Sequence, residues 1–465
     1  MMQKFSLARL IPLPRPYWAA FAIMLAILMS VINGTIINVA LPTLSAEFGI
    51  TPSSSIWMVN AYQLVTAVSL LSFASLGDLY GYKRMFLTGI AGFTAGSLLC
   101  ALAGSFWMLV VTRVIQGLGA ACIMSVNTAL LRLIYPPEHL GRGMGLNAMV
   151  VAVSATAGPS VAGAILTFVS WHWLFLINIP FAIAAFIIGY KLLPGNPHRE
   201  GTRTFDRVSS VANAVTFGLL IYSLEGVAHD ANHLLIGIQV AVMLVVGYFF
   251  LRRQLHMDDP LFPVDLLRIP IFSMSLCTSV ASFTAQMLAL VSLPFFLQDV
   301  MDYSVADVGL MLTAWPVSTI LIAPFAGRLA DRFHPGLLCS VGLLVFAGGL
   351  FALYAIPPHT QEWDIVWRLV LCGLGFGLFQ TPNNFTIVSS APQHRSGGAS
   401  GMLGTARLLG QTLGTSLVAL LLRLHAHGEA VQFCLLIAGC CALAASVVSS
   451  VRMSQPAPNQ RNHHI

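Results

Sequence analysis

Long apolar stretches follow one another along almost the whole chain, and short polar segments separate them. An α-helix that spans a bilayer needs about 20 predominantly apolar residues, and the stretches reach that length. No alternating ten-residue pattern, which would indicate a membrane β-barrel, is present. The pattern predicts fourteen membrane-spanning helices at about residues 18–42, 55–76, 85–105, 107–130, 143–168, 172–193, 209–228, 233–251, 271–298, 305–330, 336–356, 364–389, 399–423 and 429–451.

The composition agrees with an integral membrane protein. Apolar residues make up 57% of the chain and charged residues only 9%. A soluble protein carries about 25% charged residues, so a soluble enzyme, a DNA-binding protein and a disordered scaffold are excluded. The net charge of +6 does not indicate a nucleic-acid partner, because the basic residues are scattered between apolar runs. We therefore expect an all-α protein in a lipid bilayer.

The basic residues also predict the orientation. Lysine and arginine favour cytoplasmic loops, and an even number of spans puts both termini on one side. With the termini inside, 19 of the 23 basic residues lie in cytoplasmic segments or at cytoplasmic span ends. The first span is too long for the core of a signal peptide, so we interpret it as an uncleaved membrane helix. Both termini are therefore predicted to be cytoplasmic.

The two halves of the chain repeat each other weakly. Asp78 recurs as Asp331, 253 residues later, and Gly117-Leu118-Gly119 recurs as Gly373-Leu374-Gly375, 256 residues later. Two parallel halves of this kind are typical of transporters with a site between the halves at mid-membrane. We predict a six-helix bundle over residues 1–193, a linker with two additional spans over 194–269, a second six-helix bundle over 270–452 and a cytoplasmic tail over 453–465.

Several short motifs carry a resemblance to a known family. They are Asn33-Gly34-Thr35 to Pro42, Trp57 with Tyr62, the loop from Asp78 to Arg84, Arg113-Val114-Ile115-Gln116-Gly117, Gly158-Pro159 followed by Gly163, and Trp171 to Pro180. With them the chain resembles the major facilitator superfamily and, within it, the 14-span drug:proton antiporters. The resemblance implies a major facilitator fold in a bacterial inner membrane, and its Gly-Pro element favours export over uptake.

The resemblance assigns a gate to the loop after the second span. Asp78 would hold the cytoplasmic ends of the two halves together in the outward-open state, near the start of the thirteenth span. The residues of this loop are Asp78, Gly81, Lys83 and Arg84. Lys83 and Arg84 also satisfy the orientation rule, and that role alone explains them equally well. Ala74 stands where the family motif begins with glycine, and His334 replaces a glycine of the second copy, which we expect to be degraded.

Arg113 is the most informative single residue, because its charge falls inside a predicted span. An arginine at mid-bilayer costs about 2.5–3.5 kcal/mol, so it is usually functional and paired. The spacing places Gln116 and Asn127 on the same helical face, which we expect to line a cavity. The resemblance gives the Arg113 position a part in proton coupling. The alternative is a structural arginine that bonds backbone carbonyls or reaches the interface.

Asn33 stands where the family commonly has an acid. An asparagine cannot titrate, so it cannot carry a proton. Three explanations are open: coupling lies elsewhere, protons are not used in the usual way, or the asparagine is an engineered replacement. Glu225 is the only acid well inside a predicted span, while Asp299 and Asp307 lie near outer span ends and fit solvated boundary positions better.

The interior of the predicted spans favours anionic or neutral compounds over dications, because it holds Arg113 and Arg407 against the single acid Glu225. Gln411 follows Arg407 by one helical turn and shares its face. Further candidates for the lining of a cavity are Asn60, Tyr62, Gln63, Phe295, Phe296, Trp315, Phe379, Gln380, Asn383 and Asn384. Apolar walls with a few polar groups suit small amphiphilic ligands.

The fifth span predicts a hinge. Ser154, Gly158 and Ala162 recur every four residues, so a neighbouring backbone can approach closely. Pro159 removes a helical hydrogen bond, and Gly163 continues the flexible segment. Ordinary close packing of two helices explains the same pattern.

We interpret the chain as a secondary transporter, not an enzyme. No phosphate-binding loop, nucleophile or metal cluster stands out, so we expect no cofactor and no metal. The predicted activity is export of small amphiphilic drugs or biocides by alternating access, in exchange for protons. The alternatives are a dedicated exporter of one metabolite and a transporter-like sensor that binds without carrying. A periplasmic partner is left open.

Overall fold

The computed structural model contains helices and no strands in the residues that it describes, which are 15–50, 52–55, 57–195, 205–228, 233–257, 260–357, 360–425 and 427–452. The first half of the chain forms α1 (Arg15–Phe48), α2 (Pro52–Ser55), α3 (Trp57–Tyr80), α4 (Tyr82–Ala101), α5 (Phe106–Ile134), α6 (Leu140–Phe168), α7 (Trp173–Leu176) and α8 (Asn178–Leu192). Two further helices follow, α9 (Arg207–Ala228) and α10 (His233–Leu255). The second half forms α11 (Val264–Leu267), α12 (Pro270–Phe295), α13 (Val305–Ala330), α14 (Pro335–Tyr354), α15 (Glu362–Ser390), α16 (Ser396–Leu424) and α17 (His427–Val451).

The prediction of an all-α membrane fold is confirmed. Thirteen helical segments of the described chain are long and apolar enough to cross a membrane, and they lie where spans are predicted. α9 occupies the place of the predicted seventh span with 22 residues, but it is not among the thirteen. The count of fourteen spans is therefore approximate.

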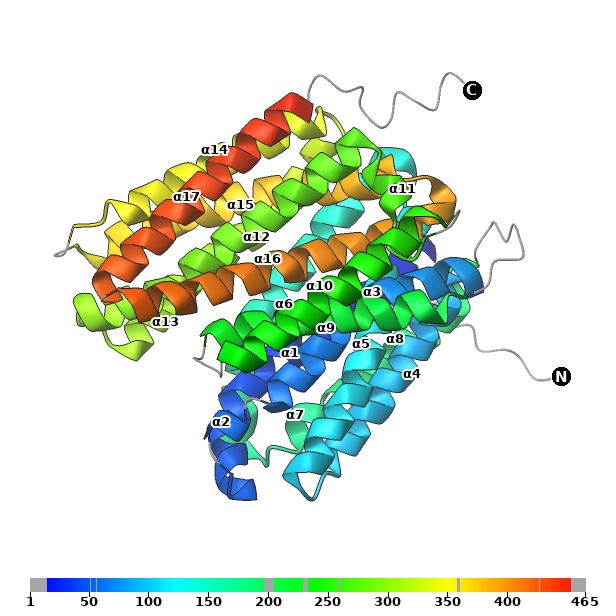
Figure 1. The fold of residues 1–465 in the computed structure, drawn as a ribbon, viewed down its shortest axis with the longest axis horizontal. Helices are drawn as coiled ribbons and strands as arrows, with labels where there is room; N and C mark the ends of the chain where they lie inside the picture. Colours follow the sequence, from blue (N-terminus) through cyan, green and yellow to red (C-terminus); the bar gives the residue numbers. More distant parts are fainter. Residues whose placement is uncertain are drawn as a thin grey trace.

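The helices of each half pack together, and α9 and α10 lie beside the line where the halves meet (Figure 1). α9 contacts α3 of the first half and α16 of the second, and α10 packs on α9. The halves touch directly through α6 with α13 and through α3 and α5 with α16. The site between the halves is therefore bordered by long helices from both of them.

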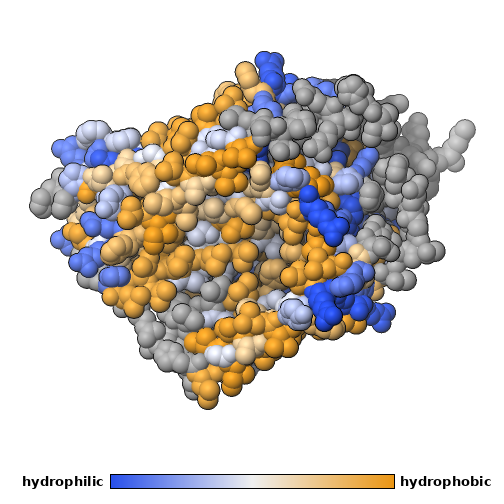
Figure 2. Space-filling view, turned by 45° about the horizontal axis from the view of Figure 1, so that its top comes forward, coloured by the Kyte–Doolittle hydropathy of each residue, from blue (hydrophilic) through white to orange (hydrophobic). Residues whose placement is uncertain are grey.

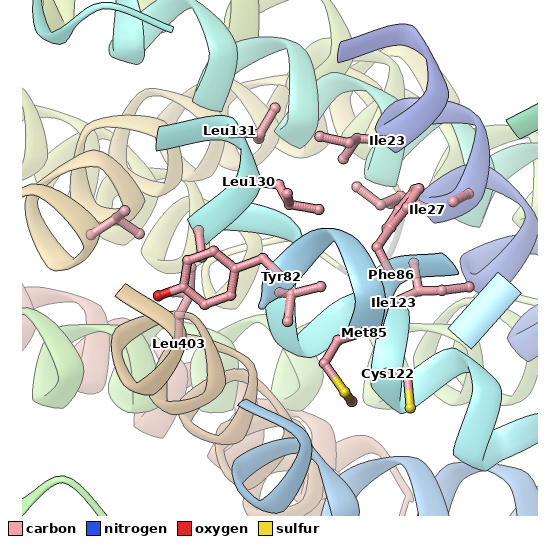
Figure 3. Close-up of a cluster of buried hydrophobic side chains, with 14 of the residues drawn as sticks. Ile23, Ile27, Tyr82, Met85, Phe86, Cys122, Ile123, Leu130, Leu131 and Leu403 are labelled. Atoms are coloured by element: carbon pink, nitrogen blue, oxygen red, sulfur yellow. The ribbon is translucent and has the colours of Figure 1, made fainter. Parts of the chain in front are cut away.

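The apolar side chains divide between an internal core and an outer belt. Figure 3 shows the core cluster to which Tyr82, Phe86 and Ile123 of the first half belong together with Leu403 of the second, and Leu403 lies beside Tyr82. Large apolar side chains such as Trp107 and Phe168 are exposed, and Figure 2 shows a broad apolar band flanked by hydrophilic patches. This distribution is that of a protein whose flanks face lipid.

Candidate functional site

Two adjoining cavities lie between the halves. The inner cavity, of about 130 Å³, is lined from α1, α5, α6, α12, α15 and α16. The outer cavity, of about 450 Å³, is lined from α1, α3, α5, α6, α9, α12 and α16. The two share a boundary formed by Val31, Met124, Arg407, Leu408 and Gln411. Because they share these walls, we treat them together as the central cavity.

The central cavity holds part of the predicted lining. Asn60, Tyr62 and Gln63 line the outer cavity, and Gln380 and Asn384 line the inner one. Sequence reasoning missed Asn147, whose amide oxygen accepts from Asn127 Nδ2 at 3.0 Å, and Tyr222 of α9. Asn147 belongs to none of the sequence motifs, and Tyr222 lies on a helix outside the repeat. Neither residue therefore stands out in the sequence.

Five predicted lining residues are absent from these walls. Trp315 and Phe379 are 1% exposed and, with Phe296, pack in the core of the second half. Asn383 is fully buried and donates to Ser279 Oγ at 2.8 Å. These four side chains point into the helix bundle. Phe295, at the end of α12, is 38% exposed and does not line either cavity.

Of the described residues that line the central cavity, Arg407 is the only charged one. Its guanidinium carbon lies 5.8 Å from the centre of the Phe283 ring. Within the described chain, no hydrogen bond or ion pair reaches its guanidinium group. An arginine inside the membrane region usually pairs with an acid or with carbonyl groups, so this charge is unusually free.

Arg113 lies in a sealed network inside the first half. It is 0% exposed, and its Nε donates to the Met58 carbonyl at 2.9 Å. Its Nη1 donates to Asn33 Oδ1 and, at 2.7 Å, to Gln116 Oε1. Gln116 Nε2 in turn donates to Ser97 Oγ at 2.8 Å. The structure thus joins the amide at position 33 directly to the arginine, a contact that the sequence analysis did not predict.

The expectation that Arg113 and Gln116 line a cavity is wrong. The Tyr62 ring covers the guanidinium at 4.3 Å and forms the cavity wall itself, while its hydroxyl donates to the Ser30 carbonyl at 2.9 Å. Asn127 does line the inner cavity. It follows Arg113 by about 21 Å along α5, so different helices surround the two residues although they share a face.

A first latch joins the halves at their predicted cytoplasmic ends. Asp78 Oδ1 accepts from the Gly397 backbone N–H at 2.9 Å, and its Oδ2 accepts from that of Gly398 at 3.2 Å. The Tyr82 hydroxyl donates to the same carboxylate at 2.6 Å. These glycines form the first turn of α16, where unpaired N–H groups favour an anion. The carboxylate thus lies where the resemblance places it.

The remaining loop residues take different places. Gly81 has a φ of 101°, a conformation that favours glycine, and it makes the turn between α3 and α4. Lys83 Nζ lies 5.8 Å from the centre of the Tyr190 ring, and Arg84 is exposed. The hydrogen bonds that Asp78 accepts come from Tyr82, Gly397 and Gly398, and within the described chain neither basic residue bonds to it, which agrees with their simpler role in orientation.

A second latch repeats the first. Asp331 Oδ1 accepts from the Gly141 N–H at 2.8 Å in the first turn of α6, and Arg142 lies 3.6 Å from its other oxygen. Burial raises the pKa of the Asp331 carboxyl above its ordinary value, although the Gly141 N–H and Arg142 act to lower it. The expectation that the second copy is degraded is therefore wrong for its carboxylate. His334 instead accepts from the Gly336 N–H at 3.1 Å and caps α14.

The structure thus has two repeated halves, a cavity between them and a similar carboxylate contact in each half. Residues 23–415 match the family model of the major facilitator superfamily. The chain belongs to the major facilitator superfamily. Its members are transporters, so the coarser prediction of a transporter is confirmed.

Relatives in the superfamily cover nearly the full chain. A protein of Escherichia coli (strain K12) described as the uncharacterized transporter YebQ is 53% identical, over 96% of this chain and 97% of its own length. The riboflavin transporter RibZ of Clostridioides difficile (strain 630) is 30% identical, over 85% of both chains. The multidrug efflux pump LfrA of Mycolicibacterium smegmatis is also 30% identical, over 87% of this chain and 80% of its own.

Of the two glycines in the predicted hinge, only Gly158 lies in close contact with a neighbouring helix. A Cβ at Gly158 would lie 2.0 Å from Thr35 Oγ1 of α1, so glycine is needed there. A Cβ at Gly163 would meet nothing within 4 Å. Pro159 and Glu225 lie in α6 and α9, and their side chains are outside the described residues.

Proposed function

We propose that the chain is a secondary active transporter of a bacterial inner membrane that exports small amphiphilic compounds by alternating access. The observation that carries the proposal is the central cavity, which lies between two repeated halves that are latched together at one end. Release of both latches and rotation of the halves would open the cavity to the predicted cytoplasmic side.

The lining supports an amphiphilic cargo. Trp57, Tyr62 and Tyr222 supply aromatic surface to the outer cavity, and Asn60 and Gln63 supply polar groups. A volume of about 450 Å³ lies in the range of sites for drug-sized ligands. A drug or biocide is the proposed substrate, as in the relative described as a multidrug efflux pump. A dedicated exporter of one metabolite is the second candidate, favoured by the relative described as a riboflavin transporter.

Proton exchange is the proposed energy source, by resemblance to the drug:proton antiporters. The titratable group is the open point, because Arg113 faces the amide of Asn33 and not an acid. Glu225 is the first acid to replace in a search for it. Proton release from everted vesicles on addition of substrate, with and without Glu225→Gln, measures its part.

Transport itself is tested with a latch variant. A Cβ at Gly397 would lie 2.4 Å from Asp78 Oδ1 and 2.7 Å from the Ala74 carbonyl oxygen, so Gly397→Ala should prevent the first latch from closing. We expect this variant to bind substrate and to lose most uptake into everted vesicles. Gly163→Ala is the matched control, since the added methyl group meets open space. Substrate binding without uptake in the unaltered chain would exclude export and favour the sensor.

A further inference from the structure

We propose that Arg407 binds the negatively charged group of the transported compound, so that the substrate class is small amphiphilic organic monoanions. This inference rests on the proposed function, because it names what the central cavity carries. It is carried by three observations: the place of Arg407, its lack of a partner, and the chemistry of the walls around it.

The place of Arg407 is the boundary between the two cavities. It lines both, as does Gln411 one turn further along α16. A ligand that enters the outer cavity therefore meets the guanidinium at its inner end. The Phe283 ring lies 5.8 Å from the guanidinium carbon and supports it through a cation–π contact. The hydrogen-bond donors at the edge of the guanidinium are left for a ligand.

Among the residues that the structure describes, the charge of Arg407 has no counter-ion. None of the described residues that line either cavity is an aspartate or a glutamate. The carboxylates of Asp78 and Asp331 bind helix starts at the latches. A buried charge without a partner is unfavourable, and a ligand anion would remove that cost on binding. The walls therefore select against cations and in favour of one negative charge.

Arg113 provides the internal contrast. Its Nε and Nη1 are occupied by Met58, Asn33 and Gln116, and the Tyr62 ring separates it from the outer cavity. It is fully buried, so a ligand cannot reach it. Of the two arginines that the sequence places inside spans, only Arg407 can act on the cargo.

The body of the ligand would lie in the outer cavity. Beside Arg407, amide groups of Gln380, Asn384 and Gln411 line the inner cavity and can complete the bonds to an oxyanion. Away from it, the aromatic surface of Trp57 and Tyr222 lines the outer cavity. A carboxylate, sulfonate or phosphate monoester on an aromatic ring matches this division. A guanidinium binds planar oxyanions with two parallel hydrogen bonds, so a carboxylate fits best.

The test compares three ligands that share one ring system and differ in charge: naphthoate, naphthylmethanol and naphthylmethylammonium. Their affinities are measured by calorimetry on the full chain in lipid nanodiscs. We expect naphthoate to bind at least about tenfold more tightly than the other two, as for a charge-assisted hydrogen bond. Equal affinities, or a preference for the ammonium compound, would overturn the inference.

Variants locate the effect. Arg407→Gln should abolish the preference for naphthoate, and Arg407→Lys should keep part of it. Arg252→Gln, which removes an exposed charge at the end of α10, should leave the preference intact. If Arg407→Gln does not fold, Arg407→Met removes the charge with an apolar side chain and replaces it in the test. An unchanged preference in a folded variant without the charge would also overturn the inference.

Transport of the same ligands separates this inference from the proposed function. Uptake of all three into everted vesicles at equal rates would refute the anion site and leave export standing. Binding with the expected preference but without uptake would refute export and leave the anion site standing.

Discussion

The two halves share a helical frame but place their arginines in different surroundings. With the repeat offset of 256 residues, the counterpart of Arg113 is Leu369, and the counterpart of Arg407 is Val151. Leu369 is fully buried in the core of the second half, and Val151 lines the inner cavity. In the core, the first half therefore has the charged Arg113 where the second half has the apolar Leu369. At the cavity, the second half has the charged Arg407 where the first half has the apolar Val151. The repeat determines where helices lie, while single substitutions determine what each position does.

Removal of the sealed arginine should have the largest effect. Arg113→Leu leaves the acceptors Met58, Asn33 and Gln116 buried without their donor, and we expect a loss of about 3 kcal/mol in stability. Thermal unfolding in detergent, followed by a thiol-reactive dye, measures it. Arg407→Leu is the matched control and should unfold near the unaltered midpoint. Equal losses in both variants would contradict the contrast between the two arginines.

The second-largest effect should be the loss of either latch, and the two latches should differ in how much they stabilise the closed state. Asp78 accepts three hydrogen bonds, from Gly397, Gly398 and Tyr82. Asp331 accepts one backbone bond at 2.8 Å and faces an exposed arginine. We expect Asp78→Ala to weaken the closed state by about 2 kcal/mol and Asp331→Ala by about half of that, since each bond to a carboxylate contributes 1.5 kcal/mol or more before solvent competes.

Accessibility of the inner cavity measures both latches. Ser400 lines that cavity one turn beyond Gly397, so Ser400→Cys in a chain without other reactive cysteines reports opening toward the predicted cytoplasmic side. Everted vesicles expose this side to an impermeant thiol reagent. Labelling should be fastest with Asp78→Ala, and a faster reaction with Asp331→Ala would reverse the predicted order.

A smaller effect is expected when a buried amide becomes an acid. Asn33→Asp gives Arg113 a counter-ion, which should stabilise the protein by about 1 kcal/mol and increase proton release on substrate addition. Asn383→Asp is the matched control, because Asn383 Oδ1 accepts from the buried Arg452 at 2.7 Å in the second half. It should stabilise without coupling. Proton release from both variants alike would show that the place of Asn33 is not special.

The smallest expected effect is on the pH dependence of the second latch. Burial holds the pKa of Asp331 above its ordinary value, so the closed latch binds a proton more tightly than the open one. The closed state should therefore become more stable as pH falls toward the ordinary aspartate pKa of about 3.9, and less stable as pH rises. Distances between labels on α6 and α13 report this, and Asp331→Asn should flatten the profile.

His139 is the neighbour that needs its own control in that experiment, since its charge acts to lower the pKa of Asp331. His139→Gln should therefore enlarge the pH response of the unaltered latch. A smaller response in this variant would mean that the histidine, and not the carboxylate, causes the dependence.

The helical frame could be predicted from the sequence because apolar length acts locally, whereas the first latch, which joins residues 319 positions apart, was expected only from the family resemblance. The second latch was underestimated: His334 breaks the motif, but Asp331 needs only the Gly141 N–H, which lies 190 residues away. That pairing depends on how the halves meet, and no local pattern contains it.

The lining of the cavity was harder to predict, because residues on the same face of a helix can lie against different neighbouring helices. Gln380 and Asn383 are one turn apart on α15, yet one lines the inner cavity and the other is sealed by Ser279. The cost of its charge in the bilayer distinguishes Arg113 in the sequence, but only the Tyr62 ring in the structure shows that it lies behind the cavity wall. Tyr222 could not be found, because α9 has no counterpart in the repeat.

The absence of an acid among the described residues that line the central cavity has an energetic consequence. The charge of Arg407 stays with the protein through the cycle, so the net charge moved is that of the cargo. A cell interior is electrically negative, and a compound with one negative charge leaves it down the potential, with about 2.3 kcal/mol for each 100 mV. That corresponds to roughly fifty-fold depletion without any proton. An asparagine at position 33 then costs such an exporter no driving force.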